Sequence, residues 1–365
     1  MTIKDDVFKG KTVLVTGHTG FKGAWLSIWL KELGANVIGY ALGPHTQEDI
    51  FVTAGLRDKI ASSVIGDVRG IGTLHRIFES SSPEIVFHLA AQPIVRTSYA
   101  EPKLTYDTNI MGTVNVLECC RLSNSVKAVV VVTSDKCYEN REWDWGYREN
   151  DALGGHDPYS SSKACAEIIT AAYRDSFLRQ QGKRIATARA GNVIGGGDWQ
   201  TDRLVPDCIR ALKKHEAIKV RNPQSVRPWQ FVLEPLAGYL MLVEKLMGED
   251  GEKYEGAWNF APSADNTLTV KDIVESVIEN WGEGRYTVGY DYTPEAKMLM
   301  LDASKARRLL HWKPKLPISD AIRYTVDWYR NDKPDYDFCV RQLFLCEAAQ
   351  RLCCEAVIGK GEGKK

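Results

Sequence analysis

An apolar strand that runs directly into a glycine-spaced loop near the start of the chain most limits what this sequence can fold into. Residues 12–15 read as a strand, residues 24–33 have helical spacing, and the loop between them reads Thr16-Gly17-His18-Thr19-Gly20-Phe21-Lys22-Gly23. Glycines three residues apart allow a tight turn, a close approach of the backbone to a pyrophosphate, and close helix-on-strand packing. In this context the pyrophosphate would lie at the helix N-terminus. We therefore predict a dinucleotide-binding loop, with a structural turn as the alternative.

The residues expected to contact the dinucleotide extend beyond this loop. Within it they are Gly17, His18, Thr19, Gly20, Phe21, Lys22 and Gly23. His18 and Lys22 add positive charge that would either touch the phosphates or point to water. After the third strand, Asp67 would accept a hydrogen bond from the adenine amine and Val68 would pack on the ring, unless this is a plain surface turn. The second strand ends at residues 39–42 with neither the acid typical of NAD sites nor an arginine, so these residues do not separate NAD from NADP.

Short β-branched runs alternate with longer amphipathic stretches through the first half of the chain. The expected strands are Thr12–Val15, Asn36–Tyr40, Ser62–Ile65, Ile85–Leu89, Val126–Val132 and Ile185–Arg189. Near-continuous aliphatic strands that alternate with helices indicate a parallel sheet covered on both faces. We expect an α/β fold with a doubly wound parallel (Rossmann) sheet and a smaller, interleaved C-terminal substrate-binding lobe.

The domain boundaries follow from where this rhythm breaks. We expect a dinucleotide-binding domain over residues 1–190, to which a segment at about 228–262 returns, and a mainly substrate-binding lobe over 191–355. Residues 356–365 are rich in glycine and lysine, which predicts a disordered tail.

Charge and composition exclude several classes of partner. The chain has 47 basic and 47 acidic residues, and no basic stretch is interleaved with aromatics, so we expect no nucleic-acid partner. The aliphatic runs are far shorter than the roughly 20 residues that span a bilayer, and the first residues are polar, so we expect no membrane partner and a cytoplasmic location. The nine cysteines lack metal-ligand spacing, which predicts free thiols and no metal site.

A tyrosine and a lysine four residues apart open the helix that follows a Gly-Gly-His-Asp-Pro turn. The spacing of Tyr159 and Lys163 places the phenol and the ammonium on one helical face. A phenol with a pKa near 10 is a poor base at neutral pH, so a neighbouring cation that stabilises phenolate is useful. The pair alone is a common surface pattern, but the upstream glycine loop makes it strong evidence of a catalytic site.

Four segments in chain order resemble the extended short-chain dehydrogenase/reductase superfamily over roughly residues 10–330. They are the glycine loop, His88-Leu89-Ala90-Ala91-Gln92, Thr108-Asn109-Ile110-Met111-Gly112-Thr113-Val114-Asn115-Val116-Leu117-Glu118, and Tyr159 with Lys163. The resemblance implies that the cofactor is lined by Leu89, Ala90, Ala91, Thr108 and Thr133. It also implies that Lys163 bonds the nicotinamide ribose, that Tyr159 acts as acid and base on the substrate hydroxyl, and that Ser134 completes the triad.

The two residues after Ser134 distinguish reactions within this superfamily. Its 4-epimerases usually carry small or neutral residues there, and its nucleotide-sugar 4,6-dehydratases carry an acidic pair, typically Asp-Glu. Here the pair is Asp135-Lys136, which resembles the dehydratase branch that acts on CDP-glucose, as do the loop T-G-H-T-G-F-K-G and residues 189–199. A surface ion pair at a strand end is the alternative interpretation.

These resemblances imply a complete reaction. An NAD-dependent hydro-lyase would convert CDP-D-glucose to CDP-4-keto-6-deoxy-D-glucose, in deoxysugar biosynthesis of the O-antigen type. Tyr159 would take the C4 hydroxyl proton while Ser134 orients it, and Lys136 would take the C5 proton while Asp135 protonates the C6 oxygen, although these last two roles could be exchanged. The alternatives are a nucleotide-sugar 4-epimerase, a 4,6-dehydratase for a dTDP- or GDP-hexose, and an NAD-binding scaffold or sensor without turnover.

The second lobe is expected to hold the nucleotide diphosphate of the sugar nucleotide. The candidate residues are Asn192, Arg203, Leu204, Arg221 and Arg227. Guanidinium groups suit this task because they bond phosphate oxygens bidentately. The helices at about 102–122 and 159–178 resemble those that pair in dimers of the superfamily, which predicts a homodimer or homotetramer.

Overall fold

A seven-stranded parallel sheet forms the centre of the molecule. The computed structural model describes residues 7–262, 267–289 and 299–346, so the tail expected at 356–365 lies outside the described residues. The strand order is β10-β6-β5-β4-β1-β2-β3, and every neighbouring pair is parallel. The strands are β1 (Thr12–Thr16), β2 (Asn36–Ala41), β3 (Ser62–Ile65), β4 (Ile85–His88), β5 (Ala128–Val132), β6 (Arg184–Ala190) and β10 (Gly256–Phe260). The predicted doubly wound α/β fold is confirmed.

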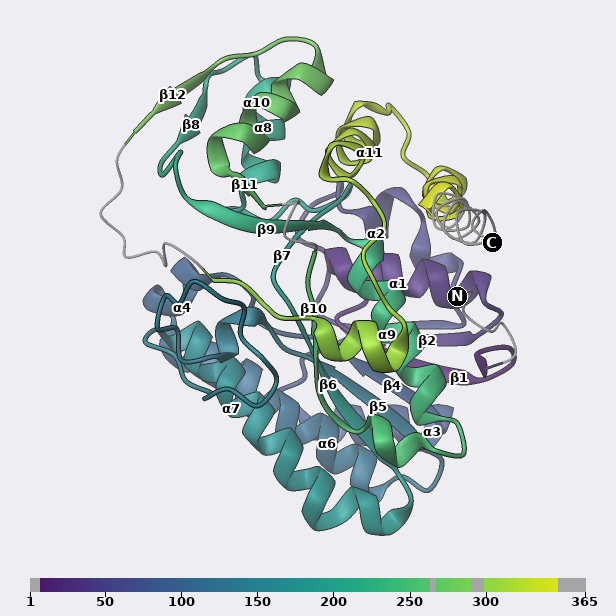
Figure 1. The fold of residues 1–365 in the computed structure, drawn as a ribbon. Coiled ribbons are helices and arrows are strands. Elements are labelled where there is room, and N and C mark those ends of the chain that lie inside the picture. The colour runs from purple at the N-terminus through teal and green to yellow at the C-terminus, as the bar shows by residue number, and fades with distance from the viewer. Residues whose placement is uncertain (1–6, 263–266, 290–298, 347–365) are drawn as a thin grey trace, which may run out of the picture.

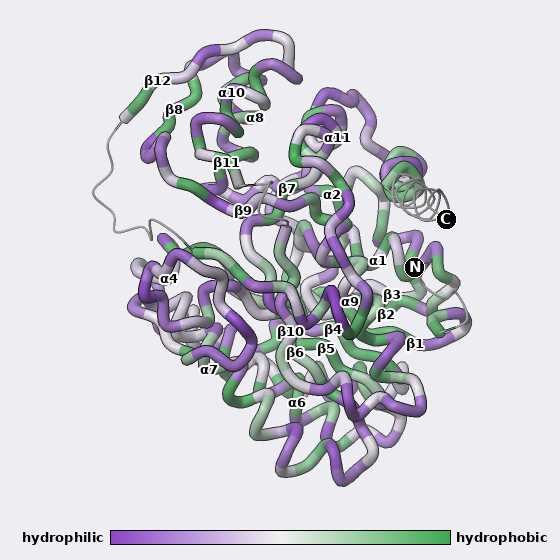
Figure 2. The backbone as a smooth tube through the Cα atoms, in the orientation of Figure 1, coloured by the Kyte–Doolittle hydropathy of each residue, from purple (hydrophilic) through white to green (hydrophobic). Residues whose placement is uncertain are grey.

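Helices cover both faces of the sheet (Figure 1). One face carries α1 (Phe21–Glu32) and α9 (Leu233–Leu246), and the other carries α3 (Ile71–Ser81), α6 (Gly112–Leu122) and α7 (Pro158–Tyr173). Alternate strand residues enter the two cores: in β1, Val13 and Val15 pack with α1 and α9, while Leu14 packs with α3 and α6. The central strands β4 and β5 are buried on both faces and are apolar almost throughout, and the hydropathy colouring of the sheet centre agrees (Figure 2).

The order of the strands reverses between β1 and β4. The chain moves outward from β1 to β2 and β3, then returns to the other side of β1 and continues through β4, β5 and β6. In open α/β sheets, ligands bind beyond the carboxyl ends of the strands at this switch point. The site is therefore expected where Thr16 and His88, which end β1 and β4, lie side by side.

A smaller lobe stands over this edge of the sheet (Figure 1). It contains a three-stranded sheet in the order β11-β9-β7 and a two-stranded sheet of β12 and β8. Its elements are β7 (Asn192–Ile194), α8 (Leu204–Lys213), β8 (Ile218–Val220), β9 (Val226–Phe231), β11 (Thr267–Thr269), α10 (Val270–Trp281), β12 (Tyr286–Val288) and α11 (Ile318–Arg330). Between β9 and β11 the chain returns from the smaller lobe to the central sheet. There α9 packs against one face of the sheet and β10 pairs with β6.

Shorter elements connect these two parts. They are α2 (Ile50–Thr53), α4 (Val95–Ala100), α5 (Pro102–Tyr106), π-helices at Asp107–Met111, Arg174–Leu178 and Ala306–Leu310, and 3-10 turns at Leu56–Asp58, Asp135–Cys137, Arg179–Gln181 and Gly251–Tyr254. A last helical stretch at 336–346 lies against α1, where the Tyr336 hydroxyl donates to Glu32 Oε1 at 2.7 Å. In the described ranges, no helix is long and apolar enough to cross a membrane.

Candidate active site

A cavity of about 1260 Å³ lies between the carboxyl edge of the central sheet and the smaller lobe. Both parts of the chain line it, as expected for a site at the switch point. It gathers every predicted site residue except His18, namely Gly17, Thr19, Gly20, Phe21, Lys22, Gly23, Asp67, Val68, Leu89, Ala90, Ala91, Thr108, Thr133, Ser134, Asp135, Lys136, Tyr159, Lys163, Asn192, Arg203, Leu204, Arg221 and Arg227. Residues as far apart in the chain as Gly17 and Arg227, which are 210 positions apart, therefore share one cleft.

The glycine loop has the geometry of a pyrophosphate cradle. Gly17 has a φ of +78°, and a Cβ there would lie 2.8 Å from the backbone nitrogen of Ala90. A Cβ at Gly23 would lie 2.1 Å from the Gly17 carbonyl oxygen, so this position also requires glycine. Gly20 is the N-cap of α1, and the amides of the first helical turn have no intrahelical acceptor. These amides line the cleft, and the residues present fit a dinucleotide.

The structure corrects the prediction for His18. Its side chain is completely buried and faces neither the cleft nor water. Nε2 lies 2.7 Å from the Ser63 hydroxyl, and the ring meets Phe51 edge-on. Gly39 makes room for it, since a Cβ there would lie 2.2 Å from the His18 ring. Burial lowers the pKa of His18 to about 4, so the imidazole is neutral and adds no charge for a phosphate.

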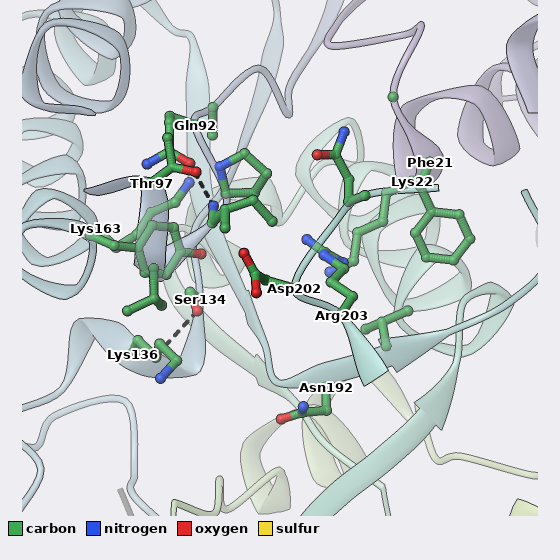
Figure 3. A pocket seen from close by; sticks show the side chains of 18 of the residues that line it. Phe21, Lys22, Gln92, Thr97, Ser134, Lys136, Lys163, Asn192, Asp202 and Arg203 are labelled. Atoms are coloured by element: carbon green, nitrogen blue, oxygen red, sulfur yellow. Dashed lines mark hydrogen bonds between the residues drawn. The ribbon is translucent and has the colours of Figure 1, made fainter. Parts of the chain in front are cut away.

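Lys22, by contrast, lies in the cleft (Figure 3). Burial lowers its pKa to about 7, and the Arg203 guanidinium contributes further by repulsion, while Asp135 and Asp198 oppose the shift. The first turn of α1 thus places an ammonium that titrates near neutrality close to both the predicted catalytic pair and the predicted diphosphate arginine.

The predicted adenine contacts lie at the end of β3. Val68 and Asp67 both line the cleft. The Asp67 carboxylate accepts from the backbone nitrogen and Nε of Arg69, both at 2.9 Å, and these bonds hold its pKa below the usual value. The Tyr40 hydroxyl donates to the Asp67 carbonyl at 2.8 Å, which fixes the turn that carries both residues.

The start of α7 positions the tyrosine and the lysine. The side chain of the N-cap residue Asp157 accepts from the Ser160 amide at 2.9 Å, and Pro158 occupies the first helical position. Tyr159 and Lys163 are consequently both buried on the helical face toward β5, where Lys163 Nζ lies 3.4 Å from the Val132 carbonyl.

Burial dominates the ionisation of both groups. It raises the pKa of Tyr159 to about 12, although a hydrogen bond with Ser134 opposes the rise, and it lowers the pKa of Lys163 to about 8, opposed by the Glu167 carboxylate. In the cofactor-free protein at neutral pH, the phenol is therefore protonated and Lys163 remains mostly charged.

Ser134, Asp135 and Lys136 form one turn at the end of β5. The Ser134 hydroxyl donates to Asp135 Oδ1 at 2.8 Å. It also accepts from the Lys136 amide at 3.2 Å, which is the dashed line between these two residues in Figure 3. Ser134 also lies close enough to the Tyr159 phenol to lower its pKa, against the larger effect of burial. Asp135 is buried and Lys136 is half-buried. A Cβ at Gly191 would lie 3.0 Å from Asp135 Oδ2, so the glycine after β6 provides the space for this carboxylate.

The smaller lobe supplies the facing wall. Asn192 begins β7, Arg203 is the N-cap of α8, and Leu204 is its first residue. Arg203 Nη1 pairs with Asp198 Oδ2 at 3.2 Å, which holds the guanidinium at the cleft. Arg221 follows β8 and Arg227 lies in β9, and both line the cavity.

Sequence reasoning missed a charged bridge across this cleft. Asp202 Oδ1 lies 3.4 Å from Arg96 Nη1, which precedes the substrate lobe in the chain, and 3.5 Å from Arg221 Nη1. Asp202 points into the cleft between the two walls (Figure 3). Its only signal in the sequence is adjacency to Arg203, and nothing local predicts that residues 96 and 221 meet at one carboxylate.

The fold and the site define a class of protein. A doubly wound sheet with a glycine loop at its switch point, a Tyr-Lys pair on α7 and a serine at the end of β5 match the extended short-chain dehydrogenase/reductases. Residues 14–325 match the family model for GDP-mannose 4,6 dehydratase, and the chain belongs to this family. The resemblance to nucleotide-sugar 4,6-dehydratases inferred from the sequence is therefore confirmed.

Individual proteins of known name are similar to this chain in sequence or in fold. The chain is 48% identical over 335 residues to the CDP-glucose 4,6-dehydratase of Salmonella typhimurium, covering 90% of this chain and 93% of the relative. It is 26% identical to the dTDP-glucose 4,6-dehydratase 1 of Escherichia coli, covering 87% and 92%. In fold it is similar to the dTDP-glucose 4,6-dehydratase of Bacillus anthracis in complex with NAD (TM-score 0.72, 21% identity, 88% and 97% covered). It is also similar to the UDP-glucose 4-epimerase of Thermotoga maritima with UDP-glucose (TM-score 0.74, 23% identity, 87% and 98% covered).

Proposed function

We propose that this protein is an NAD-dependent CDP-glucose 4,6-dehydratase, which converts CDP-D-glucose to CDP-4-keto-6-deoxy-D-glucose and water. The observation that carries the proposal is the turn in which the Ser134 hydroxyl donates to Asp135, with Lys136 next in the chain and the Tyr159 phenol near Ser134, in a cleft large enough for a dinucleotide and a sugar nucleotide. The 48% identity to a CDP-glucose 4,6-dehydratase supports the choice of nucleotide.

The cofactor would lie along the carboxyl edge of the sheet. The amides after Gly20 would hold the pyrophosphate, Asp67 and Val68 the adenine, and Lys163 the nicotinamide ribose. Bound NAD supplies the acceptor for the C4 hydride and the donor that returns a hydride to C6. NAD in the solved relative of Bacillus anthracis supports this choice over NADP.

The first step is oxidation at C4. The C4 hydroxyl proton passes to Tyr159 as the C4–H bond gives up its hydride, and a ketone forms. Since burial raises the pKa of Tyr159 to about 12, this phenol must be made more acidic before it can act as a base. Ser134 lowers the pKa of this phenol, and the charge of the nearby Lys163 and of a bound oxidised cofactor would favour phenolate.

The second step removes water across C5 and C6. The ketone acidifies the C5 proton, which we assign to Lys136, and Asp135 gives a proton to the departing C6 hydroxyl. Hydride return to C6 would be supplied by bound NAD, and Lys136 would give the proton back to C5, so that one water has left overall. A 4-epimerase needs neither Asp135 nor Lys136 for its chemistry, and the pair therefore favours dehydration.

The sugar nucleotide would lie against the smaller lobe. Asn192, Arg203, Leu204, Arg221 and Arg227 line this side of the cavity. Their guanidinium groups suit a diphosphate, and this distribution explains how a chain of balanced charge can bind two anionic ligands. The domain assignment follows from this division: the first domain, with α9 and β10, carries the cofactor, and the lobe carries the substrate.

The proposal is tested by offering CDP-, dTDP-, GDP- and UDP-hexoses side by side in heavy water. We expect a 4-keto-6-deoxy product from CDP-glucose that carries solvent deuterium at C5. A product epimerised at C4 with no deuterium at C5 would refute dehydration, and a clear preference for a dTDP- or GDP-sugar would refute the nucleotide. Lys136→Ala should still oxidise C4, seen as reduced cofactor at 340 nm, but form no product; normal product formation would refute its role.

We further propose a homodimer formed through α6 and α7, and a cytoplasmic location. Large apolar side chains are exposed on or beside these two helices at Met111, Leu122, Ile168 and Phe177, and such clustered exposure marks interaction sites. Ile168→Glu should convert a dimer to a monomer in light scattering, whereas Val288→Glu, at an exposed position of the other lobe, should not. The free thiols of the described cysteines support a reducing compartment.

A further inference from the structure

A buried ion pair lies directly behind the proposed catalytic turn and has no part in the steps above. Glu167 Oε2 and Arg189 Nη2 are 2.8 Å apart, and their side chains are only 4% and 3% exposed. Glu167 lies one helical turn after Lys163 on α7, and Arg189 lies in β6. The pair thus links the helix that carries the tyrosine and lysine to the strand beside β5.

Both oxygens of the Glu167 carboxylate accept hydrogen bonds from residues of β6 and from Thr133, which follows β5. Oε1 accepts from the Thr133 hydroxyl and from Arg189 Nε at 2.9 Å. Oε2 accepts from the Thr187 hydroxyl at 2.6 Å as well as from Arg189 Nη2. Thr133 follows β5 and immediately precedes Ser134, so one arm of this network reaches the first residue before the catalytic turn.

The Arg189 guanidinium reaches the other end of the same turn. Nη1 donates to the Tyr138 hydroxyl at 2.6 Å, and the guanidinium carbon lies 4.7 Å from the centre of the Tyr138 ring. The Tyr138 hydroxyl in turn donates to Asn259 Oδ1 at 2.8 Å, and Nη1 also donates to the Glu149 carbonyl at 3.2 Å. Tyr138 is 1% exposed, and it follows the turn directly.

We propose that the Glu167–Arg189 ion pair is the positioning device of the catalytic turn, holding residues 134–137 at both ends through Thr133 and Tyr138. The proposal rests on the proposed function, because it assigns the turn a catalytic task. Glu167 and Arg189 touch none of the reacting atoms in this assignment. They act by fixing where Ser134, Asp135 and Lys136 stand relative to Tyr159.

A positioning role explains why a charge pair is kept in this place. Desolvating two ions costs so much that a buried pair is weak evidence for stability, and apolar side chains of similar volume often serve the fold equally well. A fully satisfied polar network does fix a unique geometry. Catalytic groups require such precision, since a displacement of about 1 Å can cost about 100-fold in rate.

The two arms and a matched control can be removed one hydrogen bond at a time. Thr133→Val removes the arm before the turn, and Tyr138→Phe removes the arm after it. Thr187→Val deletes a hydroxyl of the same kind from the same carboxylate, but on β6, away from the turn. All three positions are buried, so the three variants are comparable in packing.

We expect Thr133→Val and Tyr138→Phe each to lower kcat for CDP-glucose at least tenfold, with KM within twofold of the unaltered protein. Tyr138 is not among the predicted cofactor contacts, so Tyr138→Phe should also keep the Kd for NAD within twofold. Thr187→Val should keep kcat within twofold. In the ligand-free proteins, amide hydrogen exchange in residues 134–138 should quicken at least tenfold in the first two variants and stay unchanged in Thr187→Val.

The proposal is overturned if Thr187→Val loses as much activity as the other two, since the pair would then be a general support. It is also overturned if exchange at residues 134–138 is unchanged in Thr133→Val and Tyr138→Phe, or if their loss appears only in KM or cofactor affinity. The exchange measurement needs no turnover, so it decides the positioning role even if the unaltered protein has no activity on any nucleotide sugar, an outcome that would refute the proposed function alone.

Discussion

Glu234 is a buried carboxyl group in α9. The unaltered protein should lose stability as pH rises because this group ionises, and a variant without the carboxyl group should not. The residue is 2% exposed, and its Oε1 accepts from the backbone nitrogens of Lys315 and Leu316, both at 3.0 Å. These bonds join α9, beneath the sheet, to the segment that leads into α11. Burial nevertheless dominates and raises the pKa of Glu234 from 4.5 to about 7.

The raised pKa fixes the sign and the size of the effect. Between pH 4.5 and about 7, Glu234 keeps its proton in the folded state but has released it in the unfolded state. The contribution of this group to the free energy of unfolding is therefore largest below pH 4.5 and is lost as pH rises through 7. At about 1.36 kcal/mol per pH unit, the loss between pH 5 and pH 8 is roughly 2.5 kcal/mol. Glu234→Gln keeps an oxygen acceptor for both amides but has no proton to lose.

The measurement is urea unfolding of both proteins at pH 5 and pH 8, followed by circular dichroism. We expect the free energy of unfolding of Glu234→Gln, relative to the unaltered protein, to improve by roughly 2.5 kcal/mol from pH 5 to pH 8. Glu249→Gln, at an exposed position just beyond α9, should show no such pH-dependent gain. A constant difference between the Glu234 variant and the unaltered protein at both pH values would refute the reasoning.

Three further perturbations test the site and its support. Gly191→Ala should lower kcat about tenfold with an unchanged Kd for CDP, because the new Cβ meets Asp135 Oδ2 at 3.0 Å; an unchanged kcat would show that this carboxylate can move freely. Lys183→Met should lower the free energy of unfolding in urea by about 3 kcal/mol, because the buried Lys183 ammonium donates to three carbonyls at the end of α6. The control Lys127→Met, at the surface, should lower it by under about 1 kcal/mol. Asp202→Asn should tighten CDP binding about two- to fivefold in calorimetry at low salt, because a competing anion leaves the two arginines; weaker binding would instead make Asp202 a ligand contact.

The sheet could be predicted because its signals are local. Aliphatic runs such as Val129–Val131 are buried on both faces and cannot serve as amphipathic strands, so their pattern alone indicates a parallel sheet. The sequence predicts that a segment at about 228–262 returns to the first domain, but it does not predict that β10 pairs with β6. The partner of this edge strand depends on how α9 packs against the sheet. The smaller lobe depends on pairings such as β7 with β9, which no periodicity in a three-residue strand reveals.

Site residues could be predicted where local backbone geometry requires one residue type. They could not be predicted where neighbouring residues determine how a side chain is oriented. Gly17 and Gly23 follow from the need for close backbone contact, and the structure shows that contact. His18 has the same place in the loop as a phosphate ligand, yet the absence of a side chain at Gly39 lets its ring turn inward. The meeting of Arg96 with Asp202 depends on how the two walls face each other, which lies beyond any local signal.

The position of Ser134 gives a physical reason for the order of roles in the catalytic turn. Its hydroxyl donates to Asp135 and lies near the Tyr159 phenol, so the proposed base for the C4 hydroxyl and the carboxyl group lie beside the same serine. In a hexose, the C4 and C6 oxygens flank C5, and groups that serve them should lie together on one side of that carbon. In the proposed reaction Asp135 would protonate the C6 oxygen, and the half-buried Lys136 at the far end of the turn would take the C5 proton. The elimination needs one group that takes the C5 proton and another that donates to the C6 oxygen, and an amine beside a carboxyl group can divide these two tasks.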